Sequence, residues 1–232
     1  MLILALDTST RSCSIAVVEN QSLIAEATVL RKQTHSIHLM ELLDQVLQMA
    51  GIGLDSVEGF AVVRGPGSFT GLRIGISTVK GLAEATRKPL VGVSSLRALA
   101  CQAGHGRRLI CPMLDARKGE LYFTRYRYRK HAMERLSEIH VGPIEEAIGG
   151  LDESCLFIGD GALLYKDSIR SRLGRKAEFA PPQQGIIRAS TVAFLSMDNF
   201  IRQETDDSET FVPRYIRKSE AEFVSQTDRC IL

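Results

Sequence analysis

The sequence predicts an α/β protein built from two similar lobes. An apolar run at residues 2–6 is followed by Asp7, a polar turn and a second apolar run at 15–18. The same order returns at 109–128, where Asp115 ends a strand-like segment. The two aspartates lie 108 residues apart, close to half of the 232-residue chain. An internal duplication is the simplest explanation of this spacing, although the strand–Asp–turn order is common enough to recur by chance.

The first lobe is expected to cover residues 1–104 and to open with a meander of three strands. Its apolar runs have the length of strands that are buried on both faces. The helices carry start and stop signals: Thr34 is a candidate N-cap, Gly51 a candidate stop, and Pro89 closes the second helix. In chain order, the expected elements are strands 2–6, 15–18 and 22–30, helix 35–50, strand and loop 59–67, helix 69–86, strand 89–93 and helix 94–103.

The second lobe is expected to cover residues 105–232. It opens with the strand, aspartate, turn and strand of 109–128, and it continues with "CLFIGDGALLY" at 155–165, a strand that enters a glycine-rich turn. A helix is expected near 189–203. The tail 211–232 is expected to pack back on the first lobe.

The composition is ordinary and excludes several classes of protein. Hydrophobic residues make up 44% of the chain and charged residues 24%, and the net charge of +2 does not by itself indicate a nucleic-acid or membrane partner. Five scattered cysteines without a C-x-x-C motif indicate reduced thiols rather than disulfides or a zinc site. The short apolar N-terminus has no basic region like that of a signal peptide. We therefore expect a cytoplasmic protein without membrane contact.

The stretch "RGPGSFTGLRIG" at 64–75 looks like a phosphate-binding loop but matches none of the known patterns. A P-loop has four residues between its glycines, followed by Lys and then Ser or Thr. Here five residues separate Gly65 from Gly71, and Leu72 and Arg73 follow. The dinucleotide-binding pattern and the nucleophile elbow fail as well. The stretch is therefore expected to be a packing element that starts a helix.

Two α/β lobes that each open with a strand–Asp–turn–strand hairpin resemble the actin, Hsp70 and sugar-kinase superfamily, whose lobes have an RNase H-like fold. The resemblance implies that both hairpins face nucleotide phosphates and that a late glycine-rich turn takes the adenosine. The matching residues are a candidate remnant of a nucleotide–phosphate site: Asp7, Thr8, Ser9, Thr10, Gly159 and Gly161. The alternative is an inherited hairpin whose hydroxyl groups satisfy the turn's own N–H groups.

Five motifs along the chain resemble the TsaB family, also called YeaZ. They are "ALDTST", "GPGSFTGLRIG", "DARKGELY", "GDGA" and "RYIRKSEAE", in the family's order and over essentially the whole chain. The resemblance implies a non-catalytic subunit that binds and activates its paralogue TsaD for threonylcarbamoyl transfer to adenosine 37 of tRNAs reading ANN codons. The ATPase TsaE joins the two. No cofactor is required by the chain itself, and ATP or ADP would sit at the interface of the complex.

A second interpretation belongs to a different class. The chain would be a free-standing ATPase or phosphotransferase of the same superfamily, which turnover by the purified chain would reveal. A third interpretation, a direct tRNA-binding module, predicts strongly salt-dependent binding.

The resemblance also implies that the paralogue's metal site is absent. TsaD carries two metal-binding histidines four residues apart in a segment like "PLVGVSSLRALA" at 89–100. Ser95 and Leu99 occupy the two histidine positions in this chain. A hydroxyl and an isobutyl group cannot replace two imidazole nitrogens, so we expect no bound transition metal.

Two helices carry an apolar surface that favours a protein partner. On helix 35–50 the apolar residues cover about half of the circumference, whereas a helix on a sheet needs a stripe of only about 100°. On helix 69–86 two glycines one turn apart would let another helix approach closely; tight packing within one chain is the alternative. The expected interface residues are Leu39, Leu42, Val46, Met49, Gly71, Leu72, Gly75, Ile76 and Val79. In the TsaB family these helices build the dimer contact, so we expect a homodimer when the paralogue is missing. A charge at Leu42 or Gly75 is expected to abolish pairing while leaving the fold intact.

The run "RYRYRK" at 125–130 interleaves aromatic and basic residues. Strand alternation places Arg125, Arg127 and Arg129 on one face and the two tyrosines on the other. The arginines are candidates for tRNA phosphate contacts, and a solvated strand face is the alternative. We expect any contact of this chain with tRNA to be indirect or weak.

Overall fold

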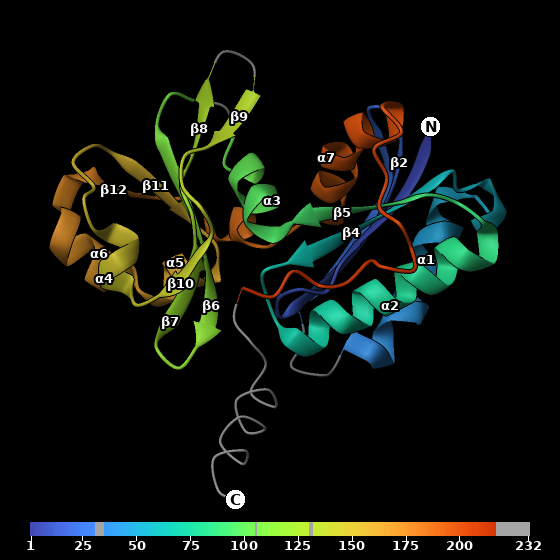
Figure 1. Cartoon of the computed structure of the whole chain (residues 1–232), viewed down its shortest axis with the longest axis horizontal. Helices are drawn as coiled ribbons and strands as arrows, with labels where there is room; N and C mark the ends of the chain where they lie inside the picture. The colour runs from blue at the N-terminus through green and yellow to red at the C-terminus, as the bar shows by residue number, and fades with distance from the viewer. Residues whose placement is uncertain (31–34, 105, 130–131, 217–232) are drawn as a thin grey trace, which may run out of the picture.

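The computed structural model describes residues 1–30, 35–104, 106–129 and 132–216, with residues 35–37 described by their backbone alone. The expected N-cap at Thr34 lies outside these residues. The chain forms two mixed sheets that stand next to each other, with helices around them (Figure 1). Two α/β units of this kind agree with the predicted pair of lobes.

The first sheet has the strand order β3-β2-β1-β4-β5. Its first three strands form an antiparallel meander, and the last two run parallel to β1. The bounds are β1 Leu2–Asp7, β2 Ser12–Glu19, β3 Ser22–Leu30, β4 Gly59–Gly65 and β5 Leu90–Ser94. The apolar runs read from the sequence are therefore strands, and β1, β2 and β4 are buried almost throughout.

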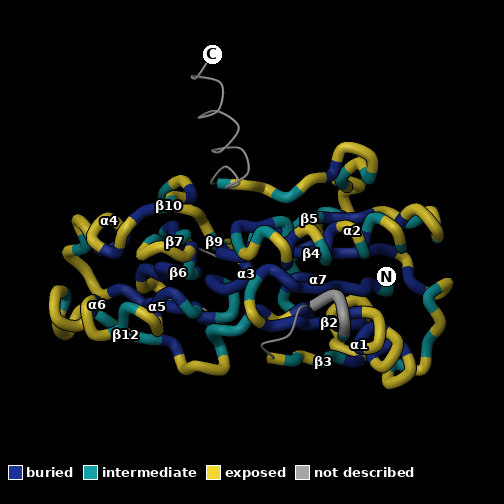
Figure 2. The backbone as a smooth tube through the Cα atoms, turned by 90° about the horizontal axis from the view of Figure 1, so that it is seen from below, coloured by how far each residue is buried: buried dark blue, intermediate teal, exposed yellow. Residues whose placement is uncertain are grey.

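Helices cover both faces of this sheet, because β1 and β2 present apolar residues on each side. Leu4 and Leu6 of β1 pack in one cluster with helices α1, His35–Ala50, and α2, Phe69–Thr86. Ile3 and Ala5, which point to the other face, pack with α7, Ala189–Ile201. Figure 1 shows this layering, with β4 and β5 between α7 on one side and α1 and α2 on the other, and Figure 2 shows that the strands are mostly buried.

The second sheet repeats the plan of the first. Its order is β10-β7-β6-β11-β12, so an antiparallel hairpin is again followed by two strands parallel to its first strand. Two more strands, β8 and β9, pair beside β6. The bounds are β6 Leu109–Arg117, β7 Glu120–Phe123, β8 Tyr126–Arg129, β9 Ala132–Arg135, β10 His140–Gly142, β11 Cys155–Ile158 and β12 Ala177–Phe179. The repeated order agrees with the predicted duplication.

Short helical segments connect the strands of the second lobe, and one 3-10 turn precedes β4 in the first. They are η1 Leu54–Ser56, α4 Ile144–Ile148, α5 Asp160–Leu164, α6 Lys166–Leu173, η2 Gly174–Lys176 and η3 Pro182–Gly185. In the described part of the chain, no helix is long and apolar enough to span a bilayer.

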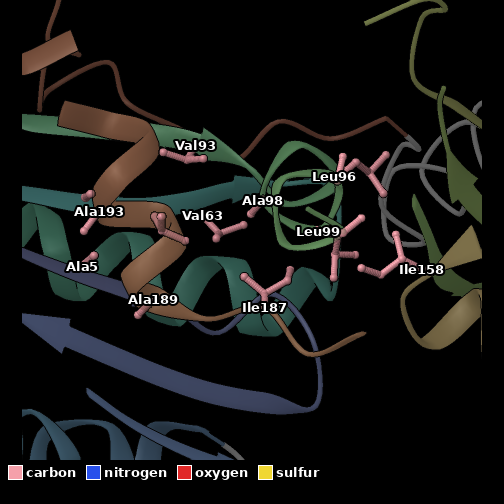
Figure 3. Packing of buried hydrophobic residues seen from close by; sticks show 14 of the residues in the cluster. Ala5, Val63, Val93, Leu96, Ala98, Leu99, Ile158, Ile187, Ala189 and Ala193 are labelled. Carbon is pink, nitrogen blue, oxygen red and sulfur yellow. The ribbon is translucent and has the colours of Figure 1, made fainter. Parts of the chain in front are cut away.

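A continuous apolar core joins the two lobes through α3, Ser95–Gln102. Leu96 and Leu99 of this helix are fully buried and belong to one cluster with Ile158 of β11 and Ile187. Figure 3 shows both leucines on the side of α3 that faces Ile158. The junction between the lobes is therefore packed with side chains around this helix.

Helix α7 packs on the first sheet, although the division at residue 104 assigned it to the second lobe. Its residues Ala189, Val192 and Ala193 are buried in the cluster that covers β1 and β2. The N–H of Ala189 donates to Ser14 Oγ of β2 at 2.9 Å. The chain thus crosses back after β12, and the expected lobe boundary is wrong for this helix.

Residues 206–216 also lie along the first lobe. Phe211 is buried in the cluster with α1 and α2. Lys80 Nζ of α2 donates to the carbonyl oxygens of Glu209 and Phe211, and the N–H of Arg214 donates to the carbonyl of Arg64 at 2.8 Å. The expected tail follows the first lobe as far as residue 216, and its remainder lies outside the described residues.

Candidate functional site

The turn between β1 and β2 holds the most unusual polar group of the molecule. Asp7 is completely buried, and its Oδ1 accepts the N–H of Ser9 at 2.9 Å and the hydroxyl of Ser9 at 2.5 Å. Its Oδ2 has no hydrogen-bond partner among the described residues. Burial raises the pKa of Asp7 to about 7, against the lowering effect of the two hydrogen bonds from Ser9. A charged carboxylate here is therefore only partly compensated.

The glycine-rich stretch closes this turn by placing the start of α2 directly on it. The N–H of Ser68 donates to the carbonyl of Ser9 at 2.7 Å, and Thr8 Oγ1 donates to the carbonyl of Gly71 at 2.7 Å. A Cβ at Gly71 would lie 2.0 Å from the Thr8 carbonyl oxygen, which only glycine avoids. The stretch is thus a packing element at a helix start, as predicted, and its neighbour is the chain's own hairpin.

The hydroxyl groups of Thr8, Ser9 and Thr10 make hydrogen bonds within the chain. Besides the contacts of Thr8 and Ser9, Thr10 Oγ1 lies 2.9 Å from Ser12 Oγ and also accepts the N–H of Ser12. A phosphate would need free N–H and hydroxyl groups at this place. The hydroxyl contacts agree with a hairpin that satisfies its own turn, and a nucleotide–phosphate role of Asp7, Thr8, Ser9 and Thr10 stays a prediction.

The glycine-rich turn of the second lobe is likewise occupied by packing. Gly159 has a φ of 107°, and a Cβ there would lie 2.2 Å from the carbonyl oxygen of Met113 on β6. A Cβ at Gly161 would lie 2.6 Å from Leu121 and 3.0 Å from the backbone of β6. Both glycines let the start of α5 rest on β6, which explains them without an adenosine.

Two aspartates of the second lobe contact each other at the hairpin of that lobe. Asp160 Oδ1 accepts the N–H of Asp115, the aspartate that corresponds to Asp7 in the second lobe, at 3.1 Å. Burial raises the pKa of Asp160, and the positive charge of Arg11 in the first hairpin opposes this shift.

The two positions that correspond to metal-binding histidines are both buried. Ser95 Oγ donates to the carbonyl of Pro66 at 2.5 Å, which ties α3 to the glycine-rich stretch. Leu99 lies in the core between the lobes (Figure 3). Each side chain therefore has a packing role in place of a ligand role.

We expect the purified protein to carry no stoichiometric transition metal, because a hydroxyl and an isobutyl group cannot supply two imidazole ligands. Elemental analysis of the protein after chelator treatment and dialysis measures this directly. One iron or one zinc per chain that survives this treatment would contradict the prediction.

The interface predicted on α1 and α2 is wrong for eight of its nine residues. These eight are buried inside the chain itself: Leu39, Leu42, Val46, Gly71, Leu72, Gly75, Ile76 and Val79. Met49 differs, with 61% of its surface exposed. The wide apolar arc of α1 faces its own sheet, and a Cβ at Gly75 would lie 2.3 Å from Thr8 Oγ1. The close approach indicated by the glycines is real, but it is made to the β1–β2 hairpin.

A different surface of the same helices is open to a partner. On α2, the small residues Ser77, Gly81 and Ala85 are exposed one turn apart, and nothing lies within 4 Å of a Cβ at Gly81. Ile74, Thr78 and Leu82 beside them are half-buried. We call these six residues the α2 outer face. It contains no charge, and its spacing of small residues was a signal available in the sequence.

The arginines of the basic strand are paired within the second lobe. Arg125 donates to the carbonyls of Ala147 and Gly149 at the end of α4. Arg127 pairs with Glu153, and Arg129 Nε lies 3.2 Å from Glu134. These contacts leave little free charge on this strand for RNA.

Comparison with known proteins identifies the family. Residues 24–224 match the family model described as TsaD: tRNA N6-adenosine threonylcarbamoyltransferase. A Bacillus subtilis protein named tRNA threonylcarbamoyladenosine biosynthesis protein TsaB is 33% identical over 225 residues, which is 96% of this chain and 96% of that protein. The chain belongs to the TsaB family. The protein of the same name from Escherichia coli is 36% identical over 173 residues, 72% of this chain and 74% of that protein.

Solved structures agree with this assignment. YeaZ from Pseudomonas aeruginosa superposes with a TM-score of 0.79 at 29% identity, over 93% of this chain and 99% of that one. The ethanolamine utilization protein EutJ from Carboxydothermus hydrogenoformans, with a TM-score of 0.55 at 14% identity, shares the fold alone. The predicted α/β fold of two similar lobes is confirmed. A threonylcarbamoyltransferase from Solidesulfovibrio magneticus is 33% identical over 129 residues, 49% of this chain and 35% of that enzyme.

Proposed function

We propose that this TsaB-family chain is a non-catalytic subunit that binds and activates a TsaD-type transferase. The transferase would move a threonylcarbamoyl group to adenosine 37 of tRNAs that read ANN codons. One observation carries the proposal: the α2 outer face is an uncharged surface of small and apolar side chains on a rigid helix. Such a surface lets a second helix approach closely.

The proposal that the chain is not itself an enzyme is supported by its hairpin turns. The hydroxyl groups of Thr8, Ser9 and Ser95 all donate hydrogen bonds to acceptors within the chain. We therefore place any ATP or ADP used by the complex at the interface with the partner subunits, and we propose that the chain requires no cofactor of its own. The rival function, a free-standing ATPase or phosphotransferase, predicts turnover by the purified chain at a rate that Asp7→Asn abolishes.

Replacing Gly81 by arginine is expected to weaken pairing with the transferase at least about a hundredfold. Such a loss corresponds to roughly 3 kcal/mol, which an unpaired charge in a dry interface readily exceeds. The fold should persist because the new side chain enters open space. Pairing is measured by titration with the purified transferase. The matched control is Gly106→Arg in the second lobe, where a Cβ meets only ordinary contacts.

A folded Gly81→Arg protein that pairs as tightly as the wild type would place the interface elsewhere.

We further propose that the same face forms a homodimer when the transferase is missing, with Met49 at its edge. The single substitution should therefore convert the self-associated wild-type chain to a monomer in light scattering. TsaE would join the complex through the transferase and this chain together, and a pull-down with all three proteins shows its dependence on the pair.

A further inference from the structure

The segment from α6 to β12 carries a net positive charge. Residues 166–178 hold five cations, Lys166, Arg170, Arg172, Arg175 and Lys176, and two carboxylates, a net charge of +3. The whole chain has a net charge of +2, so the remaining residues are slightly acidic. We call the five cations the α6 basic surface. All of them except the half-buried Lys166 are exposed.

These cations have no acidic partner among the described residues, unlike four arginines elsewhere in the second lobe. Ion pairs join Arg108 to Glu178, Arg127 to Glu153, Arg129 to Glu134 and Arg135 to Glu138. Within the described ranges, none of the five cations of the α6 basic surface makes an ion pair. The lobe thus pairs Arg127 and Arg129 with carboxylates, whereas the α6 basic surface has no carboxylate partner in the described part of the chain and can attract an anion.

An aromatic ring holds two of the cations in place. Lys166 Nζ lies 5.5 Å and Arg170 Cζ 5.3 Å from the centre of the Phe179 ring, which itself packs against Phe157 of β11. The two cations are one helical turn apart, a spacing at which like charges destabilise a helix. The ring thus holds two cations side by side, and no carboxylate of the residues that the structure describes pairs with either of them. Such an arrangement suits a ligand that carries repeated negative charges.

The surface occupies one end of the molecule. Arg175 and Lys176 immediately precede β12, whose first residue Ala177 pairs with Cys155, which in turn pairs with Leu109 of β6. Arg107 and Arg108 precede β6 and therefore extend the same end of the sheet. Figure 1 shows α6 and β12 at the end of the molecule opposite to α1 and α2. A ligand here would leave the α2 outer face free for a partner protein.

We propose that the α6 basic surface binds the sugar–phosphate backbone of tRNA. The choice of RNA rests on the proposed function, in which tRNA is the substrate of the complex. The charge and geometry of the surface favour a phosphate chain on their own account, because guanidinium groups form paired hydrogen bonds with phosphate. Ile169, the apolar residue between the cations, is fully buried, so α6 has no apolar face to insert into a bilayer.

The test removes three charges from the surface and three from the opposite end of the molecule. The variant Arg172→Gln/Arg175→Gln/Lys176→Gln is compared with Arg87→Gln/Lys88→Gln/Arg202→Gln, which lowers the net charge equally. Binding of unfractionated tRNA to the full-length chain, alone and with the transferase, is measured between roughly 50 and 200 mM salt. Because the substituted α6-surface residues are exposed, melting curves should match the wild type.

The surface variant is expected to bind tRNA about tenfold more weakly or worse, and to reduce the slope of log K against log salt by about 2 to 3. The control variant should change neither quantity by a comparable amount. Equal losses in both variants, no loss in the surface variant, or no tRNA binding by the wild type would each overturn the proposal. Binding to anionic phospholipid vesicles in preference to tRNA would overturn it as well. Pairing with the transferase, measured without tRNA, reports separately on the proposed function.

Discussion

Replacing Gly75 by arginine is expected to destabilise the chain strongly, whereas Gly81→Arg in the same helix is expected to leave its stability unchanged. A Cβ at Gly75 would lie 2.3 Å from Thr8 Oγ1 and 3.0 Å from Leu6, both in the core of the first lobe. Overpacking together with a buried unpaired charge costs about 4 kcal/mol or more, against a total stability of roughly 5–15 kcal/mol. A Cβ at Gly81 meets no atom within 4 Å.

Circular dichroism and urea titration of both variants measure the difference. Leu42→Glu should behave like Gly75→Arg, because Leu42 is only 6% exposed on α1. This reverses the expectation from the sequence, where a charge at either position was to abolish pairing without loss of fold. A Gly75→Arg protein with a wild-type urea midpoint would show that α2 is able to move away from the hairpin, and would contradict the packing described for it.

The sequence predicted the secondary structure of the first lobe closely because its signals are local. The period of the apolar residues and the cap positions placed α1 and α2 at residues 35–50 and 69–86, which are their observed bounds. The position of α7 was not predictable in this way. Its apolar residues indicate that one face is buried, but they do not say which sheet buries it. The crossing back to the first lobe is a property of tertiary packing.

At the candidate site, too, the sequence indicates that residues are closely packed without showing what they pack against. Glycines at positions 71 and 75 report that something approaches α2 closely, and the sequence offered two explanations, a partner helix and the chain itself. The decision rests on the carbonyl oxygen and hydroxyl of Thr8, a residue more than 60 positions away. The exposed Ser77, Gly81 and Ala85 gave a weaker indication of a surface for a partner. A search for periodic apolar residues along a helix does not detect them, because their side chains are small and contribute little hydrophobicity.

Asp7 illustrates what the sequence does reveal and what burial adds to it. The aspartate at the end of β1 was identified from its position in the hairpin. Its complete burial and the unpartnered Oδ2 follow only from the way in which α2 covers the turn. Asp7 is thus a buried carboxyl group whose ionisation opposes folding.

The stability of the chain should therefore contain a component from Asp7 that falls as the pH rises from about 4 to about 7. The pKa is 3.8 in the reference state and about 7 in the folded protein. Between these values the unfolded chain has released the proton that the folded chain retains, so folding binds a proton and is weakened by a rising pH. The loss is roughly 1.4 kcal/mol per pH unit within the window and is complete above it.

Asp7→Asn should remove this component. We expect the variant to match the wild type near pH 4.5 and to be more stable by a few kcal/mol at pH 8, because the amide keeps an acceptor for Ser9 without a buried charge. The measurement is the difference in free energy of unfolding between variant and wild type across this pH range, which cancels the contributions of all other groups. Asp55→Asn on the exposed surface is the control. A flat difference for Asp7→Asn would mean that the carboxylate is compensated at neutral pH, and that the buried Oδ2 meets a cation or donor which the folded chain recruits from outside.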